Sequence, residues 1–243
     1  MSGTTSAEYV GNELPVFALA ANWKRYVSDI LRPYIVGDVL EVGAGMGAAA
    51  VALMQPAVTR WVGLEPDPEL AAIAAATPID PTGRVAQEIH TGTLADLPSD
   101  ATFDTILYID VLEHIEGDRA ELELASRHLR PGGHLIVLSP AFQFVYSPFD
   151  KAIGHFRRYT SASLRAVVPA RLHVVLSRYA DALGLLLSIA NRFLLRQSEP
   201  SRHQILTWDR VVIPTSRIVD HALSSWIGRS VIVVAQRPGA EVA

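Results

Sequence analysis

The stretch LEVGAGMG constrains the fold of this chain more than any other part of its sequence. A short predicted strand, Asp38 to Val42, runs directly into Gly43, Gly45 and Gly47, and an alanine-rich helix follows. Glycine adopts left-handed backbone angles without strain, and a turn without side chains lets backbone N–H groups approach a ligand closely. The pattern therefore predicts a strand, a glycine turn and a helix that together form a ligand-binding edge.

The order of strand and helix then repeats along the chain. RWVGLE predicts a second strand, PDPEL starts a helix with Asp67 as its N-cap, and a short strand is expected over Val85 to Thr91. FDTILYID is typical of a strand buried on both faces, and HLIVLSP predicts the next strand, after a helix that ends at RPGG. RLHVVLSRY and SVIVVAQRP lack the spacing of a strand–helix–strand unit and predict an antiparallel pair at one edge.

These elements predict an α/β fold. We expect a doubly wound, mostly parallel seven-stranded sheet with an antiparallel edge strand, helices on both faces, an N-terminal helix and a C-terminal helical lid insertion. No repeat or linker divides the chain, so residues 1–243 are expected to form one domain. Its expected parts are an N-terminal helical cap over 1–36, with a helix from about Pro15 to Leu31, a cofactor-binding core over 37–178, a helical lid insertion over 179–228, and a last strand and tail over 229–243.

Composition excludes several classes of function. The formal net charge is −4 and 19% of the residues are charged, so the chain lacks the basic field that holds nucleic acid, and we expect no nucleic-acid partner. The absence of cysteine excludes disulfides, thiolate metal sites and thiol nucleophiles. The first residues lack a basic segment followed by an apolar run, so we expect no secretory signal and a cytoplasmic location.

The most apolar stretch runs from Tyr179 to Leu195 and contains Asp181, Asn191 and Arg192. It is shorter than the roughly 20 apolar residues that a spanning helix needs. Its role stays open between a core or homodimer helix, the wall of a hydrophobic pocket, and a peripheral membrane contact through residues 179–195.

Two acidic residues indicate which ligand the glycine turn binds. Glu65 ends the second predicted strand, about 20 residues beyond the glycines, where a carboxylate can accept both hydroxyls of an adenosine ribose. Glu41, near the end of the first strand, would repel a pyrophosphate but would bind the ammonium group of an amino-acid tail. S-Adenosylmethionine has such a tail and no phosphate. A nicotinamide dinucleotide remains the alternative, because GAGMGA also fits the looser dinucleotide pattern.

The chain resembles the Rossmann-like, class I S-adenosylmethionine-dependent methyltransferases. The motifs that carry the resemblance are VLEVGAGMG, VGLEPD, GTLADLP, FDTILYIDVLEHI and LRPGGHLIVLSP, in the order that the family has them, over about residues 38–140. Upstream ELPVFALAANWKRY and downstream YSPFDKAIGHFRRY resemble a bacterial subgroup with a GHxRRY segment after the fifth strand. The resemblance implies S-adenosyl-L-methionine as the cofactor.

The resemblance also implies roles for individual positions. Gly43 and Gly45 are expected to line the cofactor, Glu65 to hold its ribose, and Asp110 to lie near its methionine part. Trp23, Lys24 and Tyr26 of the first helix either close over the cofactor or pack against the sheet. The full set expected at the cofactor is Glu41, Gly43, Ala44, Gly45, Gly47, Glu65, Pro66, Thr93, Leu94, Asp110 and Tyr26.

One segment departs from the family pattern. Thr93 follows Gly92 at the place where many members have an aspartate for the adenine amino group. The backbone of Thr93 or Leu94 is then expected to contact adenine, and Asp96 either joins them or caps the turn that follows.

Methyl transfer to oxygen needs an aligned acceptor and a base that removes its proton. Asp110 and His114 are four residues apart and would share one face of a helix, with Glu113 turned elsewhere. His155 is the expected base, and Asp150 is expected to orient its ring. Either histidine is alternatively a structural group that bonds to backbone or to a carboxylate.

Neighbouring residues are expected to bind the substrate. Arg157 and Arg158 stay protonated, so one would bind a substrate carboxylate or phosphate while the other points outward, unless both form ion pairs. Tyr146, Phe149 and Tyr159 would wall the pocket, although such aromatics are also typical of a core. A metal held by the nearby acids and histidines is conceivable, but no ligand spacing demands it, and we expect none.

The sequence thus predicts an enzyme that moves the methyl group of S-adenosylmethionine to a small-molecule acceptor. Oxygen is the expected target, and the apolar lid favours a hydrophobic or lipid-like acceptor. The expected catalytic residues are His155, Asp150 and His114, and the expected substrate-binding residues are Arg157, Arg158, Tyr159 and Tyr146. The alternatives are a non-catalytic module that binds S-adenosylmethionine, and an NAD-dependent enzyme.

Overall fold

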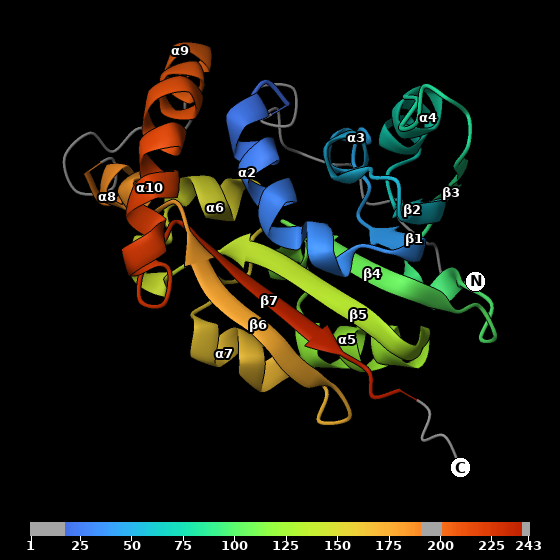
Figure 1. Cartoon of the computed structure of the whole chain (residues 1–243). Coiled ribbons are helices and arrows are strands. Elements are labelled where there is room, and N and C mark those ends of the chain that lie inside the picture. Colours follow the sequence, from blue (N-terminus) through green and yellow to red (C-terminus); the bar gives the residue numbers. More distant parts are fainter. Residues whose placement is uncertain (1–17, 191–200, 240–243) are drawn as a thin grey trace.

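A seven-stranded sheet forms the centre of the molecule, and the computed structural model describes residues 18–190 and 201–239 (Figure 1). The strand order is β3-β2-β1-β4-β5-β7-β6. The strands are β1 (Gly37–Val42), β2 (Val58–Glu65), β3 (Ala86–Thr91), β4 (Phe103–Ile109), β5 (Leu129–Pro140), β6 (His173–Ala180) and β7 (Ser230–Gln236). β7 runs antiparallel to both of its neighbours, and the other pairs are parallel. The predicted fold class is confirmed.

Helices cover both faces of the sheet, with α5 and α7 on one side and α2, α3 and α10 on the other (Figure 1). The described helices are α2 (Ala21–Leu31), α3 (Ala48–Leu53), α4 (Pro68–Ala76), α5 (Asp118–Arg127), α6 (Pro148–Ala152), α7 (Ser161–Val167), α8 (Ala182–Ala190), α9 (Arg202–Thr207) and α10 (Ile213–Leu223). A π-helical turn, η6 (Trp208–Val212), joins α9 to α10. Short 3-10 turns are η1 (Arg32–Tyr34), η2 (Leu94–Asp96), η3 (Leu112–His114) and η4 (Gln143–Val145).

The apolar strand β4 shows why two layers of helices are needed. Successive side chains of a strand point to opposite faces. Ile106 and Tyr108 belong to the core beneath α5 and α7, whereas Leu107 packs in the core on the other face, with Leu31 of α2. All four side chains are inaccessible to solvent. A strand that is apolar on both faces can be stable only between two layers, as the parallel sheet provides.

Several boundaries differ from the predicted ones. The first described helix begins at Ala21, and the predicted start at Pro15 lies outside the described residues, as does 191–195 of the apolar stretch. β5 begins at Leu129 rather than after RPGG, because Leu129 already pairs with Phe103 before a register shift. Asp67 caps α4 as predicted and accepts from two backbone N–H groups. No helix of the described residues is long and apolar enough to cross a membrane.

Three buried aspartates fasten the segment between β6 and β7, which we call the lid, to the sheet and to α2. Asp209 of η6 accepts from the backbone N–H of Trp23 at 2.8 Å and of Asn22 at 3.2 Å, so it caps the N-terminus of α2. Asp220 of α10 accepts from the Tyr26 hydroxyl at 2.7 Å. Asp220 also accepts from the backbone at the start of α8, and Asp181 accepts from Trp208 and Ser216.

Glu41 lies in the middle of the sheet and is almost completely buried. The Trp61 indole donates a hydrogen bond to its Oε2 at 3.0 Å. Burial raises the pKa of Glu41 to about 8, and the nearby Glu65 carboxylate adds to the rise. Glu41 is therefore protonated in the folded protein at pH values at which the same carboxyl is ionised in the unfolded chain.

Replacing Asp209 with alanine should lower the free energy of unfolding by about 1–2 kcal/mol, because α2 loses its cap and two backbone N–H groups lose their acceptor. Asp209→Asn keeps an acceptor oxygen at the same position and is the matched control. Urea denaturation measures both. Equal stability of the alanine variant and the wild type would contradict the capping role.

The Glu41 proton predicts a pH-dependent stability. The protonated Glu41 stabilises the fold fully at pH values below the pKa that Glu41 has in the unfolded chain. This contribution is lost as the pH rises towards its folded-state pKa of about 8. Between pH 5 and 8 the wild type should lose roughly 2–4 kcal/mol relative to Glu41→Gln, which keeps an acceptor for Trp61 without a charge. Urea denaturation at several pH values gives the difference, and parallel pH profiles would show that Glu41 is ionised in the fold.

Candidate active site

The glycine turn at the end of β1 has the conformation that its sequence predicts. Gly43, Gly45 and Gly47 all have positive φ, at 73°, 53° and 80°. A Cβ on Gly43 would lie 2.5 Å from a methyl group of Val111, whereas no atom of the described residues lies within 4 Å of the same position on Gly45. The turn therefore packs on one side and is open on the other, as close approach of a ligand to backbone requires.

Glu65 braces this turn from the end of β2. Its Oε2 accepts from the Gly45 N–H at 2.7 Å, and its Oε1 accepts from the Asp67 N–H at 3.0 Å. Burial raises the pKa of the Glu65 carboxyl. A carboxylate beside this glycine is the acceptor to which the two hydroxyls of a ribose diol can donate. Pro66 beside it is exposed, and Ala44 is buried in the turn.

The remaining residues predicted at the cofactor lie at different depths. Glu41 lies below the turn with Trp61, and Leu94 is buried in the core. Asp96 accepts from the Thr93 backbone N–H at 2.7 Å, which confirms that Asp96 caps the 3-10 turn. Tyr26 faces a second cavity, together with its partner Asp220, away from the glycine turn.

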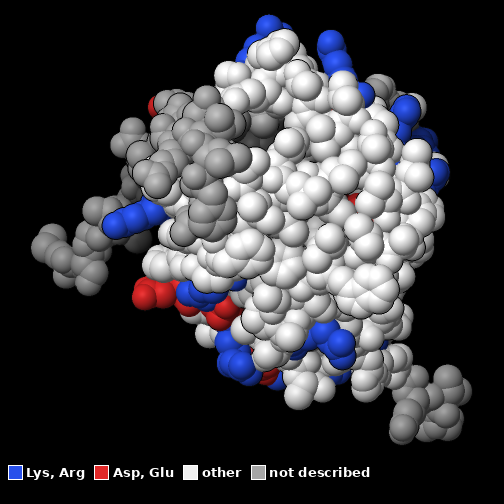
Figure 2. Space-filling model, turned by 90° about the vertical axis from the view of Figure 1, so that its left-hand side faces the viewer, with Lys and Arg blue, Asp and Glu red and all other residues white. Residues whose placement is uncertain are grey.

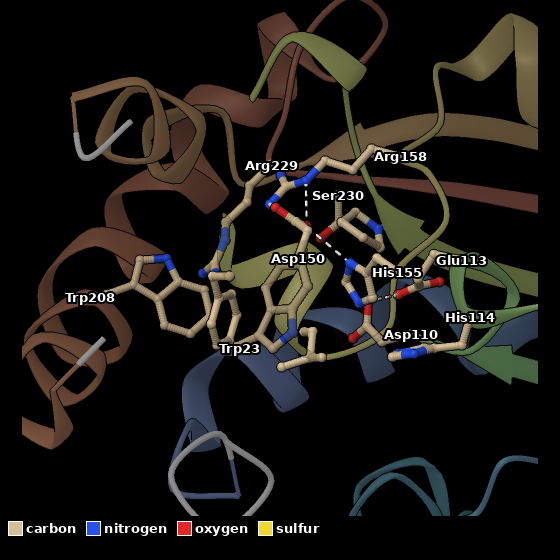
Figure 3. A pocket seen from close by; sticks show the side chains of 13 residues that line it. Trp23, Asp110, Glu113, His114, Asp150, His155, Arg158, Trp208, Arg229 and Ser230 are labelled. Carbon is tan, nitrogen blue, oxygen red and sulfur yellow. Dashed lines mark hydrogen bonds and ion pairs between the residues drawn. The ribbon is translucent and has the colours of Figure 1, made fainter. Parts of the chain in front are cut away.

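A cavity of about 190 Å³ opens at the carboxyl ends of the central strands (Figure 3). Its lining combines ionisable side chains with aromatic walls, and it draws residues from α2, η3, β5, α6, η6 and β7 and from the loops beside them. The lining residues are Trp23, Asp110, Glu113, His114, Pro140, Phe149, Asp150, Ile153, His155, Arg158, Trp208, Arg229 and Ser230. The predicted catalytic residues Asp150, His155 and His114 are thus brought together.

Asp150 is the centre of a buried hydrogen-bond cluster in this cavity (Figure 3). Its Oδ1 lies 2.9 Å from His155 Nδ1 and 2.8 Å from Arg158 Nε, and its Oδ2 lies 3.0 Å from Arg158 Nη2. Ser147 donates to it as well. Although burial opposes ionisation, these donors hold the pKa of Asp150 far below its usual range.

An ionised Asp150 can only accept hydrogen bonds, so His155 carries its proton on Nδ1 when the ring is neutral. The lone pair is then on Nε2. The nearest acid to that nitrogen is Glu113, whose Oε1 lies 3.8 Å away. This is the geometry of a histidine base held in one tautomer by a carboxylate.

Glu113 corrects one prediction from the sequence. It was expected to turn away from Asp110 and His114, but it is fully buried and lines the cavity. The reason is that no α-helix starts at Asp110: its φ is 54°, and only Leu112–His114 forms a short 3-10 turn, so the α-helical spacing does not apply. Ser139 donates to Glu113 Oε2 at 3.0 Å, and Oε1 has no hydrogen-bond partner among the described residues. Burial raises the pKa of Glu113 well above its usual value.

Two further groups complete the ionisable part of the cavity. Asp110 has a positive φ of 54° and opens onto the cavity, while the surrounding protein raises its pKa to about 6. The rings of His114 and His155 meet edge to face with centroids 4.5 Å apart. Burial and the neighbouring His155 lower the pKa of His114 to about 4, so His114 is neutral at pH 7.

Of the four residues predicted to bind substrate, the structure brings Arg158 alone to the cavity lining. Arg157 pairs with Asp118 at 2.6 Å, and Tyr159 donates to the same carboxylate at 2.7 Å. The Tyr146 hydroxyl donates to the His155 carbonyl at 2.7 Å. Arg157, Tyr159 and Tyr146 therefore hold the loop that carries His155.

Sequence reasoning missed Trp208, Arg229 and Ser230. The Arg229 guanidinium lies over the Trp208 ring at 4.5 Å from its centroid, and burial lowers the pKa of Arg229. The signal for Arg229 was its place directly before a reversed strand, which starts at the edge where parallel strands end.

Glu113, His114 and His155 each offer a ligand atom, and these atoms lie within 4.8 Å of one another. One carboxylate and two imidazoles suit several divalent ions. The absence of a metal stays a prediction.

The fold and part of the sequence match known proteins. A methyltransferase-domain family matches residues 19–171. Demethylmenaquinone methyltransferase of Tropheryma whipplei is 34% identical over 124 residues, which cover 50% of this chain and 49% of the relative. A probable S-adenosylmethionine-dependent methyltransferase of Mycolicibacterium smegmatis is 35% identical over 113 residues, 46% of this chain and 40% of the relative. The chain thus spans about half the length of the curated relatives that it matches, or less.

Solved structures show the same architecture across nearly the whole chain. The putative methyltransferase in a complex with the Haloferax volcanii Trm112 activator has a TM-score of 0.62 and 19% identity, and the match covers 92% of this chain and 94% of that one. This likeness shows the fold. The family match covers more than half of the chain and shows the family: the chain belongs to the class I S-adenosylmethionine-dependent methyltransferases, in which S-adenosylmethionine is the methyl donor.

Proposed function

We propose that this methyltransferase transfers the methyl group to a hydroxyl oxygen of a small hydrophobic acceptor, with His155 as the general base. The observation that carries the proposal is the buried Asp150–His155 pair, which fixes the tautomer and leaves Nε2 as the proton acceptor. S-Adenosylmethionine supplies an activated methyl group, so the chain must align the acceptor and remove its proton.

For the cofactor we propose the glycine turn and Glu65. A Cβ on Gly45 would touch no described residue, and Glu65 accepts from the Gly45 N–H. Glu65 would accept the ribose hydroxyls, and Asp110 would lie near the methionine part. Glu41 below the turn would meet the ammonium group, which lowers the cost of ionising a carboxyl whose pKa burial has raised to about 8.

The cavity supports an acceptor with one ionisable hydroxyl and an apolar body. Trp23, Trp208, Phe149 and Ile153 supply apolar wall, and the ionisable groups lie around His155. A neutral His114 beside His155 adds no charge to oppose proton uptake. The ionised Asp150, whose Oδ1 lies 2.9 Å from His155 Nδ1, stabilises the imidazolium that forms. The name of the Tropheryma relative, whose acceptor is demethylmenaquinone, is in keeping with an apolar acceptor.

Arg158 has a different role from the one that its sequence suggested. Both of its bonds to Asp150 are used to fix that carboxylate, so we propose Arg158 as a positioning residue rather than a substrate clamp. No metal ion is needed for this chemistry, since His155 removes the proton and two guanidinium groups, Arg158 and Arg229, already bring positive charge to the cavity.

Glu65→Gln should raise the Kd for S-adenosylhomocysteine about 10- to 100-fold, because two hydrogen bonds to a charged acceptor become bonds to an amide. Isothermal titration calorimetry measures the change. Glu69→Gln, the same substitution on the exposed start of α4, is the control and should leave Kd unchanged. An unaltered Kd in Glu65→Gln, or tight binding of NAD instead, would contradict the assignment.

His155→Ala should lower kcat about 100- to 10,000-fold and change the Kd for S-adenosylhomocysteine less than about twofold. The assay follows release of S-adenosylhomocysteine with a panel of phenols, quinols and hydroxylated lipids. His90→Ala, at an exposed histidine of β3, is the control. Turnover that persists in His155→Ala rules out the base. Binding of the cofactor without turnover by any acceptor favours the non-catalytic module.

A further inference from the structure

The outer surface of the lid is unusually apolar. Val211 and Ile218 are 61% and 74% exposed and lie seven residues apart, which places them on the same side of the continuous η6–α10 helix. Leu186 and Leu187 of α8, which packs beside α10, are 57% and 49% exposed, and Trp226 after α10 is 69% exposed. Several large, exposed apolar side chains within one segment of the fold are typical of an interaction surface.

The charges of the lid are sorted by sign. In the described residues of the segment 179–228, the three acidic side chains, Asp181, Asp209 and Asp220, are at most 2% exposed. The exposed charged side chains of the same residues are arginines, Arg202 and Arg210, and Arg217 is half-buried and paired with Asp29. On the side of α8, α9 and α10, most of the coloured face consists of residues other than Lys, Arg, Asp and Glu; Lys and Arg lie mainly along its margins, with a group of acidic residues at the lower left (Figure 2). This sorting opposes the net charge of −4 of the whole chain.

The same helix connects this surface to the cavity. In η6, Trp208 is buried and lines the cavity, whereas Arg210 and Val211 are exposed. A helix is about 10–12 Å across, so the cavity wall and the outer surface are about one helix diameter apart.

We propose that the lid docks on the surface of an anionic lipid bilayer, with Leu186, Leu187, Val211, Ile218 and Trp226 in the headgroup region and Arg202 and Arg210 on lipid phosphates. An apolar face with cationic margins is the pattern that binds at a membrane interface. Docking would hold the cavity next to an acceptor that resides in the membrane. That last step rests on the proposed function, whereas the docking does not.

A second copy of the chain fits this surface less well. In a symmetric dimer the same patch faces itself. Arg202 and Arg210 would then find no exposed acidic partner on the described lid, because its acidic side chains are buried. Anionic lipid provides the opposite charge that a second copy lacks.

Sedimentation with vesicles tests the docking. The full chain, without cofactor or acceptor, is mixed with vesicles of phosphatidylcholine alone or of phosphatidylcholine and phosphatidylglycerol in a three-to-one ratio. The chain should pellet with the anionic vesicles. Ile218→Ser should lower the partition coefficient about tenfold through lost apolar burial, and Arg210→Gln about fivefold through lost charge.

The control is Ile73→Ser on α4, which removes an exposed isoleucine outside the lid and should leave the partition unchanged. No binding to either vesicle, or equal loss in Ile73→Ser, would overturn the proposal. So would a wild-type dimer that Ile218→Ser dissociates, as measured by light scattering. Because no turnover is measured, failure of the docking leaves the proposed function standing, and loss of the His155 base leaves the docking standing.

Discussion

The active-site geometry depends on one buried carboxylate, Asp150. An isolated buried charge is costly, and Asp150 is stable because Arg158 binds both of its oxygens and His155 and Ser147 donate to it. These bonds tie α6 to the loop after it, and Arg158 also donates to the carbonyl of Ala141, directly after β5. They also set the His155 tautomer, so a packing requirement and a chemical requirement are met by the same group.

The position of this unit follows from the sheet. Parallel strands all end at one edge, and the glycine turn, Glu65 and Asp110 lie at the ends of β1, β2 and β4. β7 runs in the opposite direction and so brings Arg229 and Ser230 to the same edge at its start. The lid then closes the edge with Trp208, and its buried aspartates fix it to α2 and β6. The residues that we propose for binding the cofactor, for accepting the proton and for the apolar wall thus come together from distant parts of the chain.

Much of this could be predicted from local sequence, and the limits have physical causes. The glycine turn, the Asp67 cap and the role of Asp150 beside His155 depend on short spacings, and the structure has them all. The side of Glu113 depends on whether the turn after β4 is α-helical or 3-10, a choice that tertiary packing makes. Arg157 and Arg158 are identical neighbours in the sequence. Their ion-pair partners, Asp118 for Arg157 and Asp150 for Arg158, are set by the tertiary structure. The place of Trp208 in the cavity lining depends on how the lid packs against α2 and the sheet, which local sequence does not show.

We propose that the sulfonium of the bound cofactor faces the cavity that contains His155. A crystal structure with bound S-adenosylhomocysteine tests it most directly. In that structure the ribose hydroxyls should donate to Glu65, and the sulfur should face the space between Asp110 and His155. The proposal is contradicted if the ribose does not contact Glu65, or if the sulfur faces a part of the protein other than this cavity.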